Sequence, residues 1–293
     1  MIARAVLIAM LGVQLTPTFR SSVEVVQIPV SVREGNRVIR GLAAGDFVVT
    51  DAGVRQEVQL VSIETIPIDV TLILDTSSST TGMAERLERH VQEIVEMIGP
   101  LDALRVLRID TFVEELRPML PVTKASAAVV IPRNNGVSSV HDALIAALVR
   151  PAAADRRQLV VAITDAIDTM SSTTAERVRD VAARSEALLE LVVIRPTPSQ
   201  GRLTYVRPRF FEFSEALLTQ AAEATGGALR GRGFFDRADP VSVFKRVFDE
   251  FKQSYMLRFT PRDVPAAGWH ELSVSIPAQP QYSIRARRGY VAP

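Results

Sequence analysis

The alternation of apolar and polar residues divides the chain into three parts. From 23 to about 67 the pattern repeats every two residues, with turn signals at 34–36 and 51–53. This pattern is typical of short antiparallel strands. From 68 to about 254, apolar runs alternate with helical periodicity, which indicates a parallel α/β sheet. From 255 onward the two-residue period returns, and we expect no helix there.

The middle part contains strands and helices in alternation. We expect strands at a run from 68 into Asp75 and at 103–109, 112–119, 158–164, 188–194 and 228–230. We expect helices at 84–98, 139–149, 173–187, 214–225 and 240–253. This order predicts a doubly wound, mostly parallel sheet of about six strands.

The two flanking parts are too small to fold alone. A sheet needs roughly three strands and a covering layer for independent stability. We therefore expect 21–67 and 255–293 to pair in a small β-sandwich, with an α/β domain at 68–254 inserted between them. Such an insertion requires the ends of the inserted domain to lie close together.

Composition narrows the class of protein. The chain has 293 residues, of which 47% are hydrophobic and 23% charged, so it can bury a large core and has room for two domains. A net charge of +1 gives no global field that would recruit nucleic acid or an anionic membrane. The absence of cysteine excludes disulfides, thiolate metal sites and a cysteine nucleophile.

The first residues predict export. Arg4 precedes an apolar stretch at 5–15, which has the length of a signal-peptide core and is short for a bilayer span. We expect 1–20 to be a signal peptide or an N-terminal anchor. The protein would then be periplasmic, secreted or associated with the cell envelope. No clean small-x-small cleavage site is evident, so an anchor and an apolar first strand stay open as alternatives.

Three oxygen-bearing side chains follow the first strand of the middle part. Asp75, Ser77 and Ser79 stand directly after a nearly continuous apolar run. Oxygen ligands at the carboxyl end of a buried parallel strand suit a hard divalent cation. The alternative is that these residues cap the helix that follows, because Asp and Ser satisfy free amide groups at a helix start.

This Asp-x-Ser-x-Ser pattern resembles the metal-ion-dependent adhesion site (MIDAS) of von Willebrand factor A domains. The resemblance extends to Gly41-Leu42, Asp46-Phe47, 253–255, 268–270 and 285–290. With these segments the chain is similar to a bacterial group of von Willebrand A-related proteins, abundant in acidobacteria. In that group the A domain is flanked by β segments, and the proteins are typically exported.

The resemblance implies the remaining metal ligands. Thr164-Asp165 ends a predicted strand like the threonine-aspartate motif of the family, and Ser138 falls where a threonine of the second ligand loop normally stands. The ion would be Mg²⁺, with Mn²⁺ or Ca²⁺ as alternatives. The implied ligands all carry side-chain oxygen: Asp75, Ser77, Ser79, Ser138 and Asp165.

Two positions depart from the family pattern. Ser138 keeps the hydroxyl but lacks the methyl group that restricts the rotamer of threonine. Ala166 stands where the family usually has glycine, so a positive φ there would cost about 1 kcal/mol. Asp168 is expected to hold this loop or a water molecule behind the ligands.

Other polar residues are given structural roles. Asp69 and Asp110 lie at or near strand ends and are expected to be exposed or hydrogen-bonded, and Asp102 is expected in a turn. The three histidines lack the spacing of metal ligands. They are His90, His141 and His270.

The resemblance also implies a function. Two carboxylates balance a dication, and at least one coordination position remains for an outside ligand. We therefore expect an exported, metal-ion-dependent binding or adhesion module whose protein partner presents an exposed Asp or Glu. The alternative is a structural envelope component whose metal only stabilises loops. No nucleic acid partner is expected, nor any membrane span beyond a possible N-terminal anchor.

An enzyme is not expected. Ser77 occupies the place where a phosphatase with an aspartyl nucleophile needs its second carboxylate, and the segment 136–140 lacks the second glycine of a serine hydrolase elbow. The glycines at 231–233 do not complete a dinucleotide loop, and no Walker lysine is present.

Overall fold

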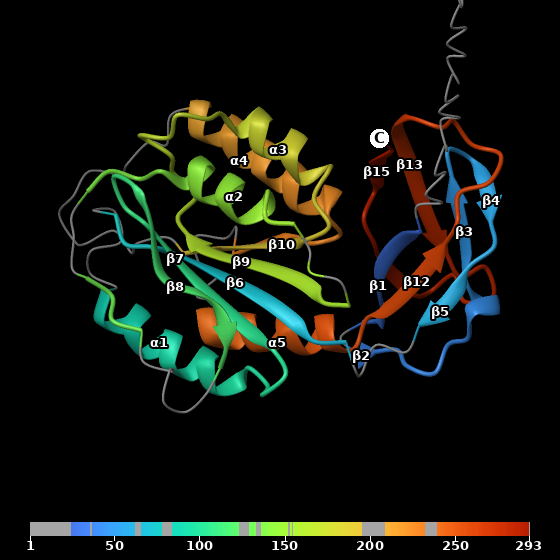
Figure 1. Ribbon diagram of the computed structural model, residues 1–293, viewed down its shortest axis with the longest axis horizontal. Helices are drawn as coiled ribbons and strands as arrows, with labels where there is room; N and C mark the ends of the chain where they lie inside the picture. The colour runs from blue at the N-terminus through green and yellow to red at the C-terminus, as the bar shows by residue number, and fades with distance from the viewer. Residues whose placement is uncertain are drawn as a thin grey trace, which may run out of the picture.

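The chain forms an α/β unit and a β unit that lie side by side (Figure 1). This architecture, seen in a computed structural model, confirms the expected fold class. The exact bounds expected for the two units stay a prediction, and the expected leader at 1–20 lies outside the described residues. The structure describes residues 25–35, 37–61, 66–77, 84–122, 129–132, 136–151, 153, 155–194, 209–231 and 239–292.

The α/β unit is built on a six-stranded sheet in the order β11-β10-β9-β6-β7-β8. Its strands are β6 (Ile68–Asp75), β7 (Ala103–Ile109), β8 (Val113–Pro121), β9 (Arg157–Thr164), β10 (Leu188–Val193) and β11 (Leu229–Arg230). All neighbours are parallel except β7 and β8. Every residue of β6 and β9 is buried, which explains their nearly continuous apolar sequences.

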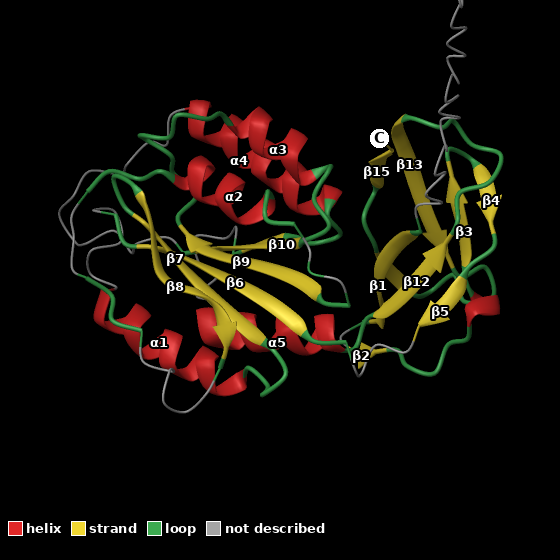
Figure 2. Ribbon diagram, viewed as in Figure 1, coloured by secondary structure: helices red, strands yellow, loops and turns green. Residues whose placement is uncertain are grey.

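Helices cover both faces of this sheet (Figure 2). They are α1 (Ala84–Met97), α2 (Val140–Leu148), α3 (Ala175–Ala182), α4 (Arg209–Ala224) and α5 (Pro240–Lys252). Successive residues of β6 point to opposite faces, so Leu72 packs in the core with α1 and α5, while Ile73 packs in the core with α2, α3 and α4.

Two helix boundaries differ from the prediction by five residues, and the others by no more than two. The third helix ends at Ala182 and not at 187, because the amides of Arg184 and Ser185 bond to carbonyls three residues earlier and tighten the last turn. The fourth helix begins at Arg209, five residues before the predicted start. The polarity of 209–213 does not show the 3.6-residue period clearly enough to predict this extra turn.

The β unit consists of two antiparallel sheets, β14-β1-β12-β5 with β2 on β1, and β15-β13-β3-β4. The N-terminal strands are β1 (Val26–Glu34), β2 (Arg37–Val38), β3 (Val48–Asp51), β4 (Val54–Gln56) and β5 (Gln59–Val61), and a short 3₁₀ turn spans Ala44–Asp46. The C-terminal strands are β12 (Tyr255–Phe259), β13 (Gly268–Ser275), β14 (Ser283–Arg285) and β15 (Gly289–Ala292). Strand β1 pairs with β12 and β3 pairs with β13, so the two flanking segments form one β unit.

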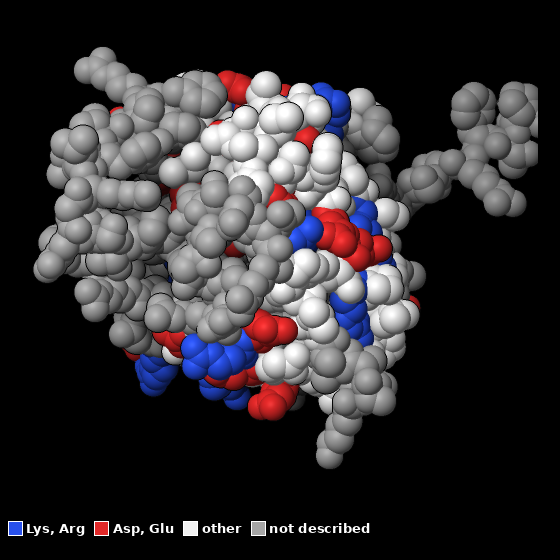
Figure 3. All heavy atoms as spheres, turned by 90° about the vertical axis from the view of Figure 1, so that its left-hand side faces the viewer, with Lys and Arg blue, Asp and Glu red and all other residues white. Residues whose placement is uncertain are grey.

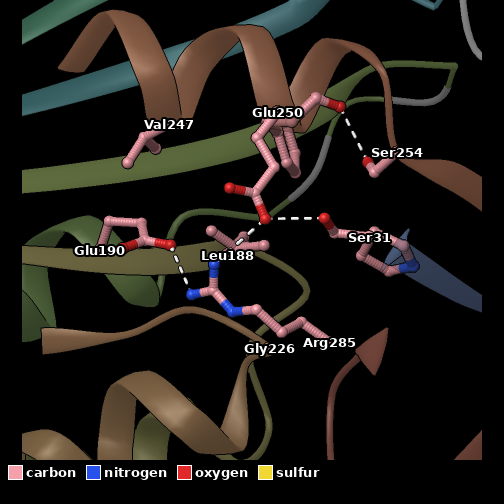
Figure 4. A pocket seen from close by; sticks show the side chains of 10 residues that line it. Ser31, Leu188, Glu190, Gly226, Val247, Glu250, Ser254 and Arg285 are labelled. Atoms are coloured by element: carbon pink, nitrogen blue, oxygen red, sulfur yellow. Dashed lines mark hydrogen bonds and ion pairs between the residues drawn. The ribbon is translucent and has the colours of Figure 1, made fainter. Parts of the chain in front are cut away.

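An ionic cluster joins the two units. Arg285 of β14 contacts Glu250 of α5 at 3.2 Å and Glu190 of β10 at 3.1 Å (Figure 4). Glu250 also accepts a hydrogen bond from Ser31 at 2.7 Å and pairs with Arg33 at 2.6 Å. Burial by itself would raise the pKa of Glu250, but the Ser31 hydroxyl and the nearby arginines hold this pKa below its ordinary value. The carboxylate of Glu250 is therefore charged and shared between the units.

We predict that Glu250→Gln lowers the free energy of unfolding by roughly 3 kcal/mol, because it leaves two arginines beside a buried neutral group. Asp249→Asn on the same helix is the matched control. Its side chain is 46% exposed and, among the described residues, forms an ion pair only with exposed Lys245, so a change within about 0.5 kcal/mol is expected. Urea unfolding measures both, and equal effects of the two substitutions would show that the cluster contributes no more than a surface ion pair.

Candidate metal centre

The carboxylate of Asp75 is the centre of the candidate site. Asp75 is the last residue of β6 and is fully buried. Its Oδ1 accepts hydrogen bonds from the amide and the hydroxyl of Ser77, at 3.0 and 2.6 Å. Its Oδ2 accepts from the hydroxyls of Thr164 at 2.6 Å and Ser138 at 3.4 Å. Three hydroxyls from three segments of the chain therefore meet at one carboxylate.

Sheet topology explains this convergence. Strand β6 lies between β7 and β9, with Leu74 opposite Ile163 and Asp75 opposite Ile109. Thr164 therefore ends β9 beside Asp75, and Asp165 follows it. The carboxyl ends of parallel strands meet at one edge of an open sheet, where such folds place their sites. This edge lies at the left-hand end of the α/β unit in Figure 1.

The segment that carries Ser138 is tied to the segment after β9. The Ser138 amide donates to the Thr169 hydroxyl at 3.0 Å. The Ser138 carbonyl accepts from the amides of Thr169 and Met170, at 2.9 and 3.0 Å. The neighbouring Ser139 hydroxyl donates to the carbonyl of Thr111 at 2.8 Å. The position of Ser138 is thus set by contacts with two other strand ends.

Asp168 holds the same two segments together, as expected. Its Oδ2 accepts from the His141 amide at 3.0 Å, and its Oδ1 accepts from the Ser171 amide at 3.1 Å. In the opposite direction, Asp142 of α2 accepts hydrogen bonds from the amides of Ser172 and Thr173, at 2.9 and 3.1 Å. Each carboxylate binds backbone amides of the other segment, so the two loops are cross-linked without a metal ion.

Burial governs the electrostatics of the site. Removal from water raises the pKa of Asp75, although the hydroxyls of Ser77, Thr164 and Ser138 act in the opposite direction. Asp165 is 2% exposed, and its Oδ1 accepts from the Ile167 amide at 2.9 Å. A cation at this edge would favour the charged form of both carboxylates.

Ala166 adopts the backbone conformation that the glycine of the family pattern would favour. Its φ is +60°, and its side chain is fully buried. Its amide donates to the Thr164 hydroxyl at 3.0 Å, so the strained turn also orients the hydroxyl that binds Asp75. The turn expected for glycine is therefore formed by alanine, at a cost of about 1 kcal/mol.

Two further polar residues lie at this edge, Thr164 and Asp110, and neither is among the five predicted ligands. Thr164 binds the central carboxylate, as described above. Asp110, just past the end of β7, is 2% exposed; its Oδ1 accepts from the Thr111 amide at 2.7 Å and its Oδ2 lies 3.5 Å from an Arg108 nitrogen. Asp110 was expected to be exposed or hydrogen-bonded, and it is hydrogen-bonded. Asp110 directly follows an apolar strand, as Asp165 follows β9. This position in the sequence could have indicated that Asp110 lies at the same edge.

The remaining polar residues are structural. Asp69 pairs with Arg156, and Asp102 accepts from the Ile68 amide at 2.9 Å. His270 lies 2.7 Å from Asp51 inside the β unit, far along the chain from the candidate ligands. These contacts explain why Asp69, Asp102 and His270 are buried, without a role as metal ligands.

The donor set fits a hard divalent cation. Within the residues that the structure describes, no three His, Cys, Asp or Glu side chains group closely enough to hold a metal by themselves. A cation at this edge would therefore depend on hydroxyl oxygens together with Asp75 and Asp165. The structure brings Ser77 and Ser138 into contact with Asp75 and places Asp165 on the adjoining turn. Ser79, the fifth predicted ligand, lies outside the described residues.

Charged side chains of both signs lie on the face that contains this edge. In Figure 3, which looks onto the left-hand end of Figure 1, acidic and basic side chains of the described residues are interspersed.

Comparisons with known proteins concern the fold. No protein-family model and no curated sequence matches the chain. A von Willebrand factor type A structure from Catenulispora acidiphila has 12% identity over 94% of this chain and 65% of that chain, with a TM-score of 0.47. An aerotolerance-related membrane protein from Bacteroides fragilis has 16% identity over 63% of this chain and 98% of that chain, with a TM-score of 0.46.

A third similar structure is proximal thread matrix protein 1 from the mussel byssus, with a zinc-occupied MIDAS motif. It has 13% identity over 69% of this chain and 49% of that chain, with a TM-score of 0.48. At these identities and scores, no property of the present site is inferred from the three proteins.

We predict that Gly136→Ala destabilises the protein by about 1–3 kcal/mol through overpacking. A Cβ atom at this glycine would lie 1.7 Å from Asp110 Oδ1 and 2.4 Å from Thr111 Oγ1, so the loop before Ser138 must move. Gly45→Ala is the control, because its Cβ would meet nothing within 4 Å. Thermal unfolding compares the two variants, and a Gly136→Ala variant as stable as Gly45→Ala would contradict the described packing of this loop.

Proposed function

We propose that this chain is a metal-ion-dependent binding module. A divalent cation, best matched by Mg²⁺ and alternatively Mn²⁺ or Ca²⁺, would be held at the carboxyl edge of the sheet and would take an acidic side chain of a protein partner. The observation that supports the proposal most strongly is the meeting of the Ser77, Thr164 and Ser138 hydroxyls at the buried carboxylate of Asp75. The proposed ligands are the five oxygen-bearing residues Asp75, Ser77, Ser79, Ser138 and Asp165.

The charge of the ligand set supports an anionic partner. Asp75 and Asp165 together balance a dication, and the hydroxyl ligands are neutral. Such an ion is not over-neutralised and still attracts a carboxylate oxygen. When bound, the cation would supply a Lewis-acidic position for that oxygen. Thr164 would act as a positioning residue, since its hydroxyl fixes the Asp75 carboxylate and is itself fixed by the Ala166 amide.

The alternative role, in which the metal only stabilises loops, is less well supported. The loops at Ser138 and Asp168 are already cross-linked by hydrogen bonds from backbone amides to backbone and side-chain oxygens of the other loop. Asp142 adds two more. A cation is therefore not required to hold these segments in place, and this favours a role in binding an outside group.

We also propose that the protein is exported and acts without catalysis. The proposal of export depends on the apolar segment at 5–15. None of the helices in the described part of the chain combines the length and the apolar character that a membrane crossing requires. N-terminal sequencing of protein from the envelope and the medium tests whether residues 1–20 are removed.

We predict that Mg²⁺ binding, measured by isothermal titration calorimetry, is lost in Asp75→Asn and weakened roughly tenfold in Thr164→Val. The first change removes the central charge, and the second removes the hydroxyl that orients it while keeping the side-chain shape. Thr164→Ser restores that hydroxyl and should bind Mg²⁺ nearly as the wild type does.

Asp180→Asn serves as the control for charge removal, because Asp180 is exposed on α3 and pairs only with Arg179 among the described contacts. It should leave Mg²⁺ binding unchanged. Unaltered binding in Asp75→Asn would place the ion elsewhere, and unaltered binding in Thr164→Val would remove the positioning role.

We further predict that immobilised protein captures a partner from an envelope extract in Mg²⁺ but not in EDTA, and that Asp165→Ala fails to capture it. Amidation of carboxyl groups in the extract should also abolish capture, because the partner would contribute an Asp or Glu oxygen. Capture that survives EDTA, Asp165→Ala and amidation would support the structural alternative instead.

A further inference from the structure

A cavity of about 270 Å³ lies between the two units, away from the candidate metal centre. Its walls come from the start of β9, the segment after α3, and strands β1 and β12 with the residues around β15. Part of the wall is apolar, contributed by Val26, Phe251 and Met256. The volume is close to the lower end of the range of small-molecule sites, so the cavity suits a compact ligand.

Arg157, the first residue of β9, lines this cavity, and its buried guanidinium group is only partly hydrogen-bonded. The residue is only 4% exposed, and its guanidinium stacks on the Phe251 ring at 3.8 Å from the centroid. One nitrogen, Nη2, donates to Ser254 Oγ at 2.6 Å. The other two nitrogens, Nε and Nη1, are buried and have no hydrogen-bond partner among the residues that the structure describes. Buried arginine is normally paired, because an uncompensated buried charge is costly.

The lowered pKa values of two buried arginines in the cavity wall reflect the cost of burying their charge. Burial lowers the pKa of Arg157 to about 9. Arg287 is 9% exposed and donates to the carbonyls of Gly289 and Ala183, and burial lowers its pKa as well. An anion placed between the two guanidinium groups would reverse both effects.

The lining carries excess positive charge. Arg157, Arg184, Arg258 and Arg287 face the cavity, and none of them forms an ion pair with a carboxylate of the described residues. Arg156 also lines it but pairs with Asp69. Against the four arginines stand two carboxylates, those of Asp155 and Glu186. The unbalanced charge is about two positive units at neutral pH, since arginine remains protonated.

We propose that this cavity binds a small polyvalent anion whose phosphate or carboxylate oxygens pair with Arg157 and its neighbouring arginines. Guanidinium groups recognise both kinds of oxygen with paired, charge-assisted hydrogen bonds. Arg157 and Arg184 belong to the α/β unit, and Arg258 and Arg287 belong to the β unit. The ligand would therefore bridge the two units and stabilise their arrangement.

This site is independent of the proposed metal centre. Arg157 begins β9, whereas Asp165 follows the opposite end of the same strand. At about 3.3 Å per residue, the eight steps from Arg157 to Asp165 separate the two by roughly 26 Å. The anion proposal therefore does not depend on the proposed binding of Mg²⁺, and each can fail while the other holds.

The test uses the full chain in EDTA at constant ionic strength, with inorganic pyrophosphate and citrate as probes and sodium chloride as reference. We expect at least one probe to raise the melting temperature saturably and to give a titration by calorimetry. Pyrophosphate alone would identify a phosphate ligand, and citrate alone a carboxylate ligand. Absence of binding by both probes would overturn the proposal.

Three substitutions locate the binding. Arg157→Gln and Arg184→Gln should each weaken the probe roughly tenfold or more, through loss of a charge-assisted hydrogen bond. Arg184 is exposed, so its replacement tests the proposal even where Arg157→Gln impairs folding. Arg55→Gln removes an exposed arginine of β4 outside the cavity and should change nothing. Equal binding of the probe by Arg184→Gln and Arg55→Gln would overturn the proposal. Asp75→Asn, which alters the candidate metal centre, should still bind the anion.

Discussion

The buried carboxylate of Asp75 is the constraint on which the candidate site depends. A charged group in this position needs compensation, and the chain supplies hydroxyls from the ends of two strands and from the loop before α2. Burial still raises the pKa of Asp75 against the effect of these hydroxyls. The site is therefore polar, close-packed and suited to an additional positive charge, which a divalent cation would provide.

The surrounding structure serves to keep that carboxylate in place. Ala166 adopts a strained backbone conformation, and its amide fixes the Thr164 hydroxyl. Asp168 and Asp142 tie the segment after β9 to the start of α2. These contacts are made between side chains and backbone of the chain itself, and they hold the segments that carry Ser138 and Asp165 beside each other.

The second unit is connected to the first through charge. Glu250 at the end of α5 and Glu190 of β10 share Arg285 of β14, and α5 leads into β12 after two residues. The arginine-lined cavity lies at this same junction, at the amino ends of the strands. The carboxyl edge of the sheet is thus left for the candidate metal centre, while the opposite edge carries the contacts between the units.

Sequence periodicity was sufficient to predict the architecture, because buried strands such as β6 and β9 have nearly continuous apolar sequences. It did not predict β15, a four-residue strand that depends on Gly289 approaching the Trp269 ring. At the site, Asp75, Ser138 and Asp165 could be predicted from motif order, whereas the role of Thr164 depends on the register between β6 and β9. The cavity could not be predicted, since Arg157 and Arg287 line it together only through the packing of two units.

The proposed function depends on a divalent cation bound beside Asp75. The most direct measurement is anomalous diffraction from crystals of the full chain soaked in Mn²⁺. We predict an anomalous peak at about 2.1 Å from oxygens of the Asp75, Ser138 and Asp165 group, with a coordination position open to solvent. A peak at another place in the molecule, with the Asp75 and Asp165 carboxylates directed away from each other, would contradict a metal site at Asp75.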